Sequence, residues 1–192
     1  YSLTLDREMT TYTGLVTLVQ LSAGILGDRN RMSYDAGISY IRNVFEATRT
    51  LQKNPDDLDA RGIIMMGASL STSSRLGIGK EEPFAYEIYE LEFLPEKLFG
   101  SSYRRSLTSV FPRFLQAMGK HHADDIRKYY HDAFGFDSSI EESSRKLVEL
   151  FEGFGVEMYY DGKITREQVD AIPCHTELSK EEVFDIINSL IR

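Results

Sequence analysis

The stretch ISYIRNVFEATRTL, residues 38–51, decides the fold class. Its apolar residues, spaced mostly three or four positions apart, are Ile38, Ile41, Val44, Phe45 and Leu51. Steps of three and four return to one face of a helix, whereas a half-buried strand would alternate with a period of two. The pattern therefore predicts a long amphipathic helix.

A second helix is expected directly downstream. Asn54, Pro55 and Asp57 form a helix-start signal, because an N-cap side chain is followed by a proline in the first turn and an early carboxylate facing the helix dipole. The helix is expected to continue through the apolar residues of segment 63–70. Gly77 or Gly79 would end it.

Further helices are predicted along the rest of the chain. Pro83 and Pro95 bracket a short segment rich in aromatic and acidic residues, and a helix of about three turns fits between them because proline breaks helix interiors. Gly135 and Gly155 are expected C-caps. The other helices are expected at 103–118, roughly 121–134 and 139–154.

The last helix carries the clearest local signal. Ser179 and Glu182 form a capping box, and Leu178 is placed to pack onto Val183 as a hydrophobic staple. No alternating run of apolar and polar residues indicates a sheet. The sequence thus predicts an all-α fold, a bundle of about eight or nine helices in a single domain spanning residues 1–192.

Composition excludes several classes of partner. The formal net charge of −8 and the pI near 5.1 argue against nucleic acid and acidic membrane surfaces, which need clustered Lys and Arg. No stretch approaches the roughly 18 apolar residues of a membrane span, and the start lacks signal-peptide features. Cys174 is the single cysteine, which fits a reducing, cytoplasmic location, and we expect it to be inert.

One cluster has metal-ligand side chains. His121, His122, Asp124, Asp125 and His131 lie close in sequence, and His121 shares a helix face with Asp125. Surface clusters of this kind rarely provide the geometry that zinc prefers. We therefore expect a solvated helix start here.

Three stretches share features with one known family. Thr13 and Gly14 open a segment similar to a T-G-x-D-A-x-x-H helix, and the residues of 57–69 resemble the family's next helix. The segment 178–187 is similar to its final capped helix. Together they resemble the C-terminal domain of iron-dependent alcohol dehydrogenases of the butanol and lactaldehyde dehydrogenase type, and the likeness covers nearly the whole chain.

The most specific correspondence lies between Tyr89 and Pro112. The family shows a His, a second His four residues on, a third ten later and a proline nine beyond that. This chain keeps the spacing with Tyr89, Phe93, Tyr103 and Pro112, but has no histidine at any of these positions. Arg104 replaces the glycine that follows the last His.

The resemblance implies where a metal site would lie. In the family one Asp and three His hold Fe(II) or a similar divalent ion such as Zn, which polarises the alcohol oxygen for hydride transfer to NAD(P). These slots fall on Val16, Gln20, Tyr89 and Tyr103, and Phe93 takes the slot of an additional active-site His. An alternative register places Tyr12 in the Asp slot and Val16 in the adjoining His slot. Neither register restores the ligands.

Two functions follow as expectations. By resemblance the chain is the metal-binding half of an NAD(P)-dependent alcohol or aldehyde oxidoreductase, inactive because its metal ligands are lost. The alternative is a non-catalytic helical scaffold or small-ligand-binding domain derived from that family. No catalytic residue, metal or cofactor is predicted for this chain. The family's nucleotide-binding N-terminal domain, absent from residues 1–192, is the expected partner, and a homodimer is an open alternative.

Overall fold

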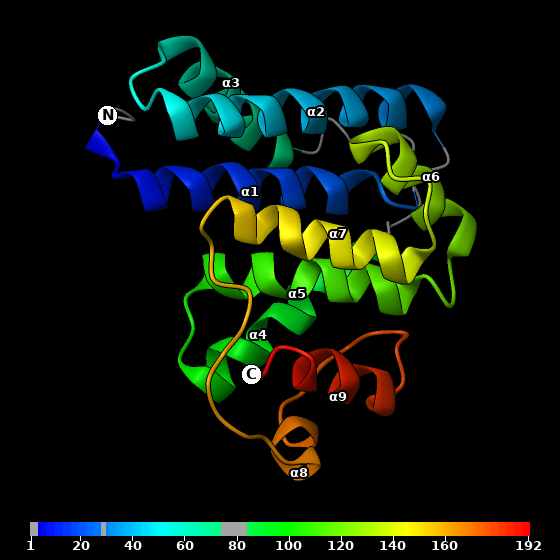
Figure 1. The fold of residues 1–192 in the computed structure, drawn as a ribbon. Coiled ribbons are helices and arrows are strands. Elements are labelled where there is room, and N and C mark those ends of the chain that lie inside the picture. Colours follow the sequence, from blue (N-terminus) through cyan, green and yellow to red (C-terminus); the bar gives the residue numbers. More distant parts are fainter. Residues whose placement is uncertain (1–3, 28–29, 74–83) are drawn as a thin grey trace.

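The computed structural model describes residues 4–27, 30–73 and 84–192. Its described helices are α1 (Arg7–Ile25), α2 (Arg31–Lys53), α3 (Leu58–Ser71), the 3-10 helix η3 (Phe84–Glu87), α4 (Ile88–Phe99), α5 (Tyr103–Met118), α6 (Ala123–Phe134), α7 (Ile140–Gly153), α8 (Arg166–Asp170) and α9 (Lys180–Asn188). Within these ranges the only β pairing is an isolated bridge between Tyr160 and Ile191. The predicted all-α bundle is confirmed (Figure 1).

Helix α1 lies at the centre of the bundle. Asp6 caps its start by accepting a hydrogen bond from the Met9 amide at 2.7 Å. Of its 19 residues, 14 are buried, so the helix is covered on nearly all sides. It packs against α2, α3 and α5, and Figure 1 shows it running between α2 and the layer that contains α5.

The helix predicted from residues 38–51 forms the middle of α2. Ile38, Ile41, Val44 and Leu51 are buried, and Phe45 packs against the core from a partly buried position. None of the described helices is long and apolar enough to cross a membrane.

The start of α3 differs from the prediction. Asp57 is the N-cap, because its carboxylate accepts a hydrogen bond from the Ala60 amide at 2.9 Å. Asn54 instead is the C-cap of α2, so Pro55 lies in the connecting turn rather than in the first turn of α3. Helix α3 ends at Ser71, and Gly77, Gly79 and Pro83 lie outside the described residues.

Pro95 lies inside α4 and does not end it, so that prediction was wrong. Its buried ring belongs to the face that α4 turns toward the core, and this packing offsets the backbone hydrogen bond that proline cannot donate. The helix continues for one turn to Phe99. Gly100 ends it in a left-handed conformation with φ 64°, and its amide donates to the Glu96 carbonyl.

The later helices follow the predicted pattern closely. Helix α5 has the predicted bounds, although Pro112 lies within it, and Gly135 caps α6 in the left-handed region. Helix α6 begins at Ala123, two residues later than expected. The predicted capping box at the start of α9 is present. The Ser179 side chain accepts from the Glu182 amide, and the Glu182 side chain accepts from the Ser179 amide.

The crossing of α1 and α2 depends on a residue without a side chain. A Cβ atom added to Gly14 would lie 2.2 Å from Oγ1 of Thr48 and 3.1 Å from its Cγ2. The Thr48 hydroxyl is committed to the Val44 carbonyl at 2.7 Å, so it cannot rotate away without losing that bond. Gly14 thus sets how closely the two helices approach.

We expect Gly14→Ala to lower the free energy of unfolding by about 1–3 kcal/mol, because the clash outweighs the higher helix propensity of alanine. Gly62→Ala in α3 is the matched control, since its added Cβ would meet no atom within 4 Å. That change should stabilise by up to about 1 kcal/mol. Urea unfolding of both variants measures the difference; equal effects would contradict the close-crossing interpretation.

Candidate functional site

A chain of polar side chains links three helices near the end of α1. Ser71, the last residue of α3, donates from Oγ to Oε1 of Gln20 at 3.0 Å. Gln20 then donates from Nε2 to the hydroxyl oxygen of Tyr103, the first residue of α5, at 3.2 Å. The Ser71 hydroxyl also lies 2.9 Å from the Ala68 carbonyl, which is a second acceptor for its single hydrogen.

Two tyrosines at this site stay protonated at neutral pH. Burial raises the pKa of Tyr89, and the neighbouring Tyr103 and Tyr86 hydroxyls add to the shift. The rings of Tyr86 and Tyr89 lie 6.2 Å apart. Burial also raises the pKa of Tyr103, partly offset by the hydrogen bond from Gln20. Both phenols are therefore neutral at pH 7.

Glu92 is a residue of this site that the sequence analysis did not single out. Its side chain on α4 is only 3% exposed, and its Oε2 atom has no hydrogen-bond partner among the described residues. Burial raises the pKa of Glu92 to about 8, and the charge of Glu96 and a hydrogen bond to it contribute further. Glu92 is thus a neutral acid at pH 7.

The other predicted positions lie in different surroundings. Val16 is buried in the main core one helical turn before Gln20. Tyr12, the alternative choice, accepts a hydrogen bond from the Glu157 amide at 3.3 Å. Phe93 is 50% exposed, so its ring does not fill an apolar core. The structure thus joins Gln20 to Tyr103 by a hydrogen bond, places Tyr89 within electrostatic reach of Tyr103, and leaves Phe93 at the surface.

These side chains do not fit Fe(II) or Zn. Both ions prefer carboxylate, imidazole or thiolate donors, and at least three of them. Gln20, Tyr89 and Tyr103 offer one amide and two phenols, so these three positions supply no carboxylate, imidazole or thiolate. In the described part of the chain, no group of three or more His, Cys, Asp or Glu side chains could hold a metal ion.

The histidine cluster divides into separate contacts with carboxylates. His121 lies 3.4 Å from Glu182, and His122 lies 2.5 Å from Glu177 while its ring stacks on Phe84 at 4.0 Å. The third histidine, His131, pairs with Asp137 at 2.6 Å. Each ring thus contacts a different carboxylate, as a polar surface would provide.

Cys174 is not an activated nucleophile. Its side chain is partly buried, and burial raises the pKa of its thiol to about 11, with smaller contributions from Glu90 and Glu87. The same two carboxylates hold the neighbouring loop, since Glu87 accepts from the Glu177 amide and Glu90 from the His175 amide. The thiol is therefore protonated at neutral pH.

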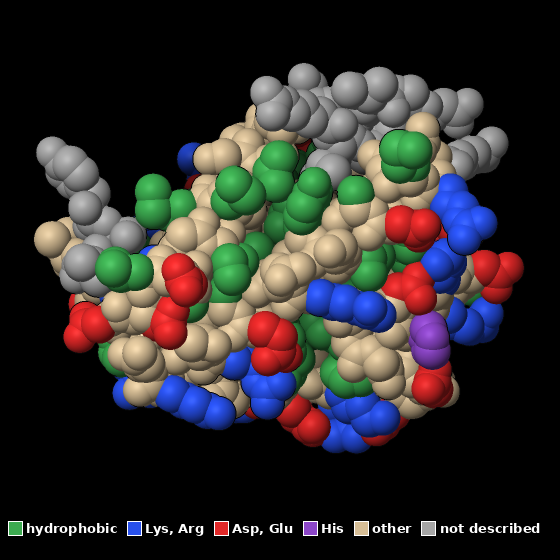
Figure 2. All heavy atoms as spheres, turned by 90° about the horizontal axis from the view of Figure 1, so that it is seen from above, with side chains coloured by type: hydrophobic (Ala, Val, Ile, Leu, Met, Phe, Trp, Pro, Cys, Tyr) green, Lys and Arg blue, Asp and Glu red, His purple; other side chains and the backbone are tan. Residues whose placement is uncertain are grey.

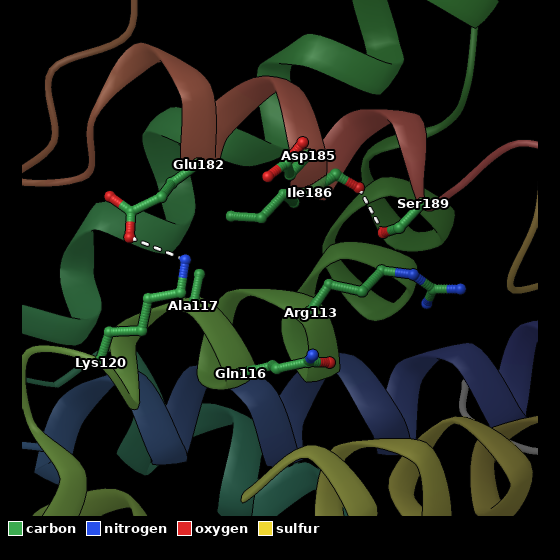
Figure 3. Close-up of a pocket in the computed structure, with 8 residues that line it drawn as sticks. All are labelled: Arg113, Gln116, Ala117, Lys120, Glu182, Asp185, Ile186 and Ser189. Carbon is green, nitrogen blue, oxygen red and sulfur yellow. Dashed lines mark hydrogen bonds and ion pairs between the residues drawn. The ribbon is translucent and has the colours of Figure 1, made fainter.

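A groove of about 280 Å³ lies between α5 and α9 (Figure 3). At one end Lys120 pairs with Glu182 at 3.2 Å, and at the other Arg113 is buried and donates to the Ser109 carbonyl at 2.8 Å. Figure 3 shows Gln116 on the α5 side between these ends. Lys120 is already paired, and the guanidinium of Arg113 also lies over the Tyr159 ring at 4.8 Å, so the groove offers little to an external ligand.

Comparison with known proteins reveals similarity at the level of structure. The sequence matches no model of a known family and no curated protein. The NADH-dependent butanol dehydrogenase A of Thermotoga maritima superposes with a TM-score of 0.83 at 17% identity, covering 99% of this chain and 54% of that one. A putative alcohol dehydrogenase of Ralstonia eutropha gives 0.76 at 18% identity, covering 98% and 54%.

A third structure extends the same likeness. Maleylacetate reductase of Agrobacterium tumefaciens gives a TM-score of 0.75 at 14% identity, covering 98% of this chain and 54% of that one. The chain therefore has the fold of the all-helical domain of iron-containing alcohol dehydrogenases, as the sequence resemblance implied. It spans about half the length of the solved structures that it matches.

We expect the stability of the protein to fall as pH rises from about 4.5 to about 8, because the folded state retains the Glu92 proton that the unfolded chain releases. The slope from this one group is at most about 1.4 kcal/mol per pH unit. Glu92→Gln should remove this component of the slope. Urea unfolding of both proteins at a series of pH values tests it, with Glu90→Gln as the control; an unchanged slope in Glu92→Gln would refute the neutral-acid assignment.

Proposed function

We propose that this chain is a metal-free derivative of the helical half of an iron-dependent alcohol dehydrogenase, without oxidoreductase activity as it stands. The observation that carries the proposal is the donor set at the inherited ligand positions. Val16 offers no donor atom, Gln20 is already hydrogen-bonded on both sides, and Tyr89 and Tyr103 are neutral phenols. Without an ion, the alcoholate that precedes hydride transfer is unstabilised.

The preferred role is therefore that of a scaffold or binding domain. A hydrogen-bonded chain from Ser71 through Gln20 to Tyr103 ties α1, α3 and α5 together, and it includes two of the positions that the family resemblance assigns to metal ligands. Such a link supports a structural role for Ser71, Gln20 and Tyr103. We include a cytoplasmic location in the proposal because the single cysteine carries no disulfide requirement.

The outer face of α3 supports a partner for this domain. From Gly62 to Ser71 the helix has no charged residue, although Ile63, Met65 and Met66 are 38%, 58% and 68% exposed. Hydrophobic side chains gather on this side of the molecule in Figure 2. An exposed face of this kind usually contacts another protein surface. We propose that a nucleotide-binding half of comparable size, like the remainder of the longer relatives, covers it.

We expect the purified chain to contain no stoichiometric iron or zinc after dialysis, and no alcohol to be oxidised with NAD(P) by the complete gene product. The physical reason is the absence of three adequate donors at the inherited positions. Elemental analysis and an assay with short primary alcohols and aldehydes measure both. One tightly bound metal per chain, lost in Tyr89→Phe and Tyr103→Phe together with turnover, would overturn the proposal.

A partner on the outer face of α3 would protect the methionines of that face from oxidation. In residues 1–192 alone, peroxide should oxidise Met65 and Met66 at rates similar to that of Met32, which is 82% exposed. In the complete gene product the two α3 methionines should react several-fold more slowly while Met32 is unchanged. Mass spectrometry gives the three rates; equal rates in both proteins would show that nothing covers α3.

A further inference from the structure

An open groove of about 500 Å³ lies on a different side of the bundle from the Gln20–Tyr103 link. It runs between α2, the turn that follows α6, and α7. Its wall is apolar and largely aromatic, with two guanidinium groups at the rim. The wall consists of Phe45, Phe134, Phe136 and Leu150, and the rim includes Arg42 and Arg49.

The aromatic wall is held by ring contacts. Phe45 meets Phe134 edge-on at 5.9 Å and Phe154 edge-on at 5.7 Å. Phe134 stacks on Phe136 at 5.6 Å. Phe45, Phe134 and Phe136 are partly buried and line the groove. Gly135 separates the last two phenylalanines with φ 70°, and a Cβ atom there would meet nothing within 4 Å, so the backbone leaves the opening clear.

Arg42 is the polar group that is positioned for a ligand. Its Nε donates to the Asp132 carbonyl at 2.6 Å, which fixes the plane of the guanidinium. Within the described part of the chain, neither Nη group of Arg42 has a hydrogen bond or ion pair. Arg49 differs, because its Nη1 pairs with Glu46 at 3.1 Å. At the rim, Arg49 is therefore already paired with Glu46, whereas Arg42 is held in place by its Nε and keeps its two Nη groups for a ligand.

We propose that this groove binds a small aromatic carboxylate, with the ring against Phe45, Phe134 and Phe136 and the carboxylate on the Nη edge of Arg42. A planar guanidinium presents two parallel N–H donors that match the two oxygens of a carboxylate. The volume lies in the range of small-molecule sites, and an aromatic body offers the edge and face contacts that the wall can accept. Glu46 also lines the groove but is already paired with Arg49, so the charge that the rim leaves for a ligand is that of Arg42.

The proposal is tested with 6-fluoro-2-naphthoate as the probe, observed by fluorine NMR on the 192-residue chain. Its neutral isostere, 6-fluoro-2-naphthamide, fills the same volume without the charge. We expect saturable naphthoate binding, and a Kd about tenfold lower than that of the naphthamide, because a charge-assisted pair contributes more than a neutral contact. Equal Kd values for the two probes, or naphthoate binding that does not saturate, would overturn the proposal on the unmodified chain alone.

Two matched variants locate the carboxylate. Arg42→Met keeps an apolar stem and should raise the Kd for naphthoate about tenfold, bringing it close to that of the naphthamide. Arg49→Met removes the paired arginine and should change the Kd less than about threefold. Melting temperatures establish that both variants are folded; if Arg42→Met is not, the naphthoate-to-naphthamide ratio of the unmodified chain decides. Equal losses in both folded variants would contradict the assignment to Arg42.

Discussion

The burial of α1 on nearly every side is the constraint on which the rest of the structure depends. A helix surrounded by other helices needs small residues where they cross and internal partners for its polar groups. Gly14 meets the first need at the α2 crossing. The second is met within the helix, since the hydroxyls of Thr10, Thr11 and Ser22 donate to carbonyls one turn earlier. The other helices are arranged around this buried rod.

The candidate site follows from the same arrangement. Near its end α1 presents Gln20 to the last residue of α3 and the first residue of α5, so two helix ends meet one side chain. At this meeting point the amide of Gln20, the hydroxyl of Ser71 and the phenol of Tyr103 satisfy one another by hydrogen bonds. Helix α4 adds Tyr89 and the neutral acid Glu92 beside them. The polar groups where the three helices meet are therefore satisfied within the protein.

Helical periodicity and capping residues were enough to predict the all-α bundle and most helix positions, because these signals are local. The effect of Pro95 was misjudged because its buried packing outweighs the rule that proline breaks a helix interior. Asn54 and Asp57 are both favourable N-cap residues, and the path of the chain determines that Asp57 is the N-cap of α3. Glu92 was missed although a signal was present: it falls on the apolar face of α4, four residues after Ile88 and three before Pro95. The exposure of Phe93 depends on neighbours that spacing cannot supply.

The central claim is that Val16, Gln20, Tyr89 and Tyr103 occupy the positions of lost metal ligands. Restoring the ligands tests it most directly, in a variant with Val16→Asp, Gln20→His, Tyr89→His and Tyr103→His. Visible absorption during Co(II) titration should show one tetrahedral ion per restored chain and none in the unmodified protein. A control in the other register, with Tyr12→Asp and Val16→His replacing the first two changes, should bind none. A folded restored variant that binds no Co(II), or a control that binds equally well, would contradict the account.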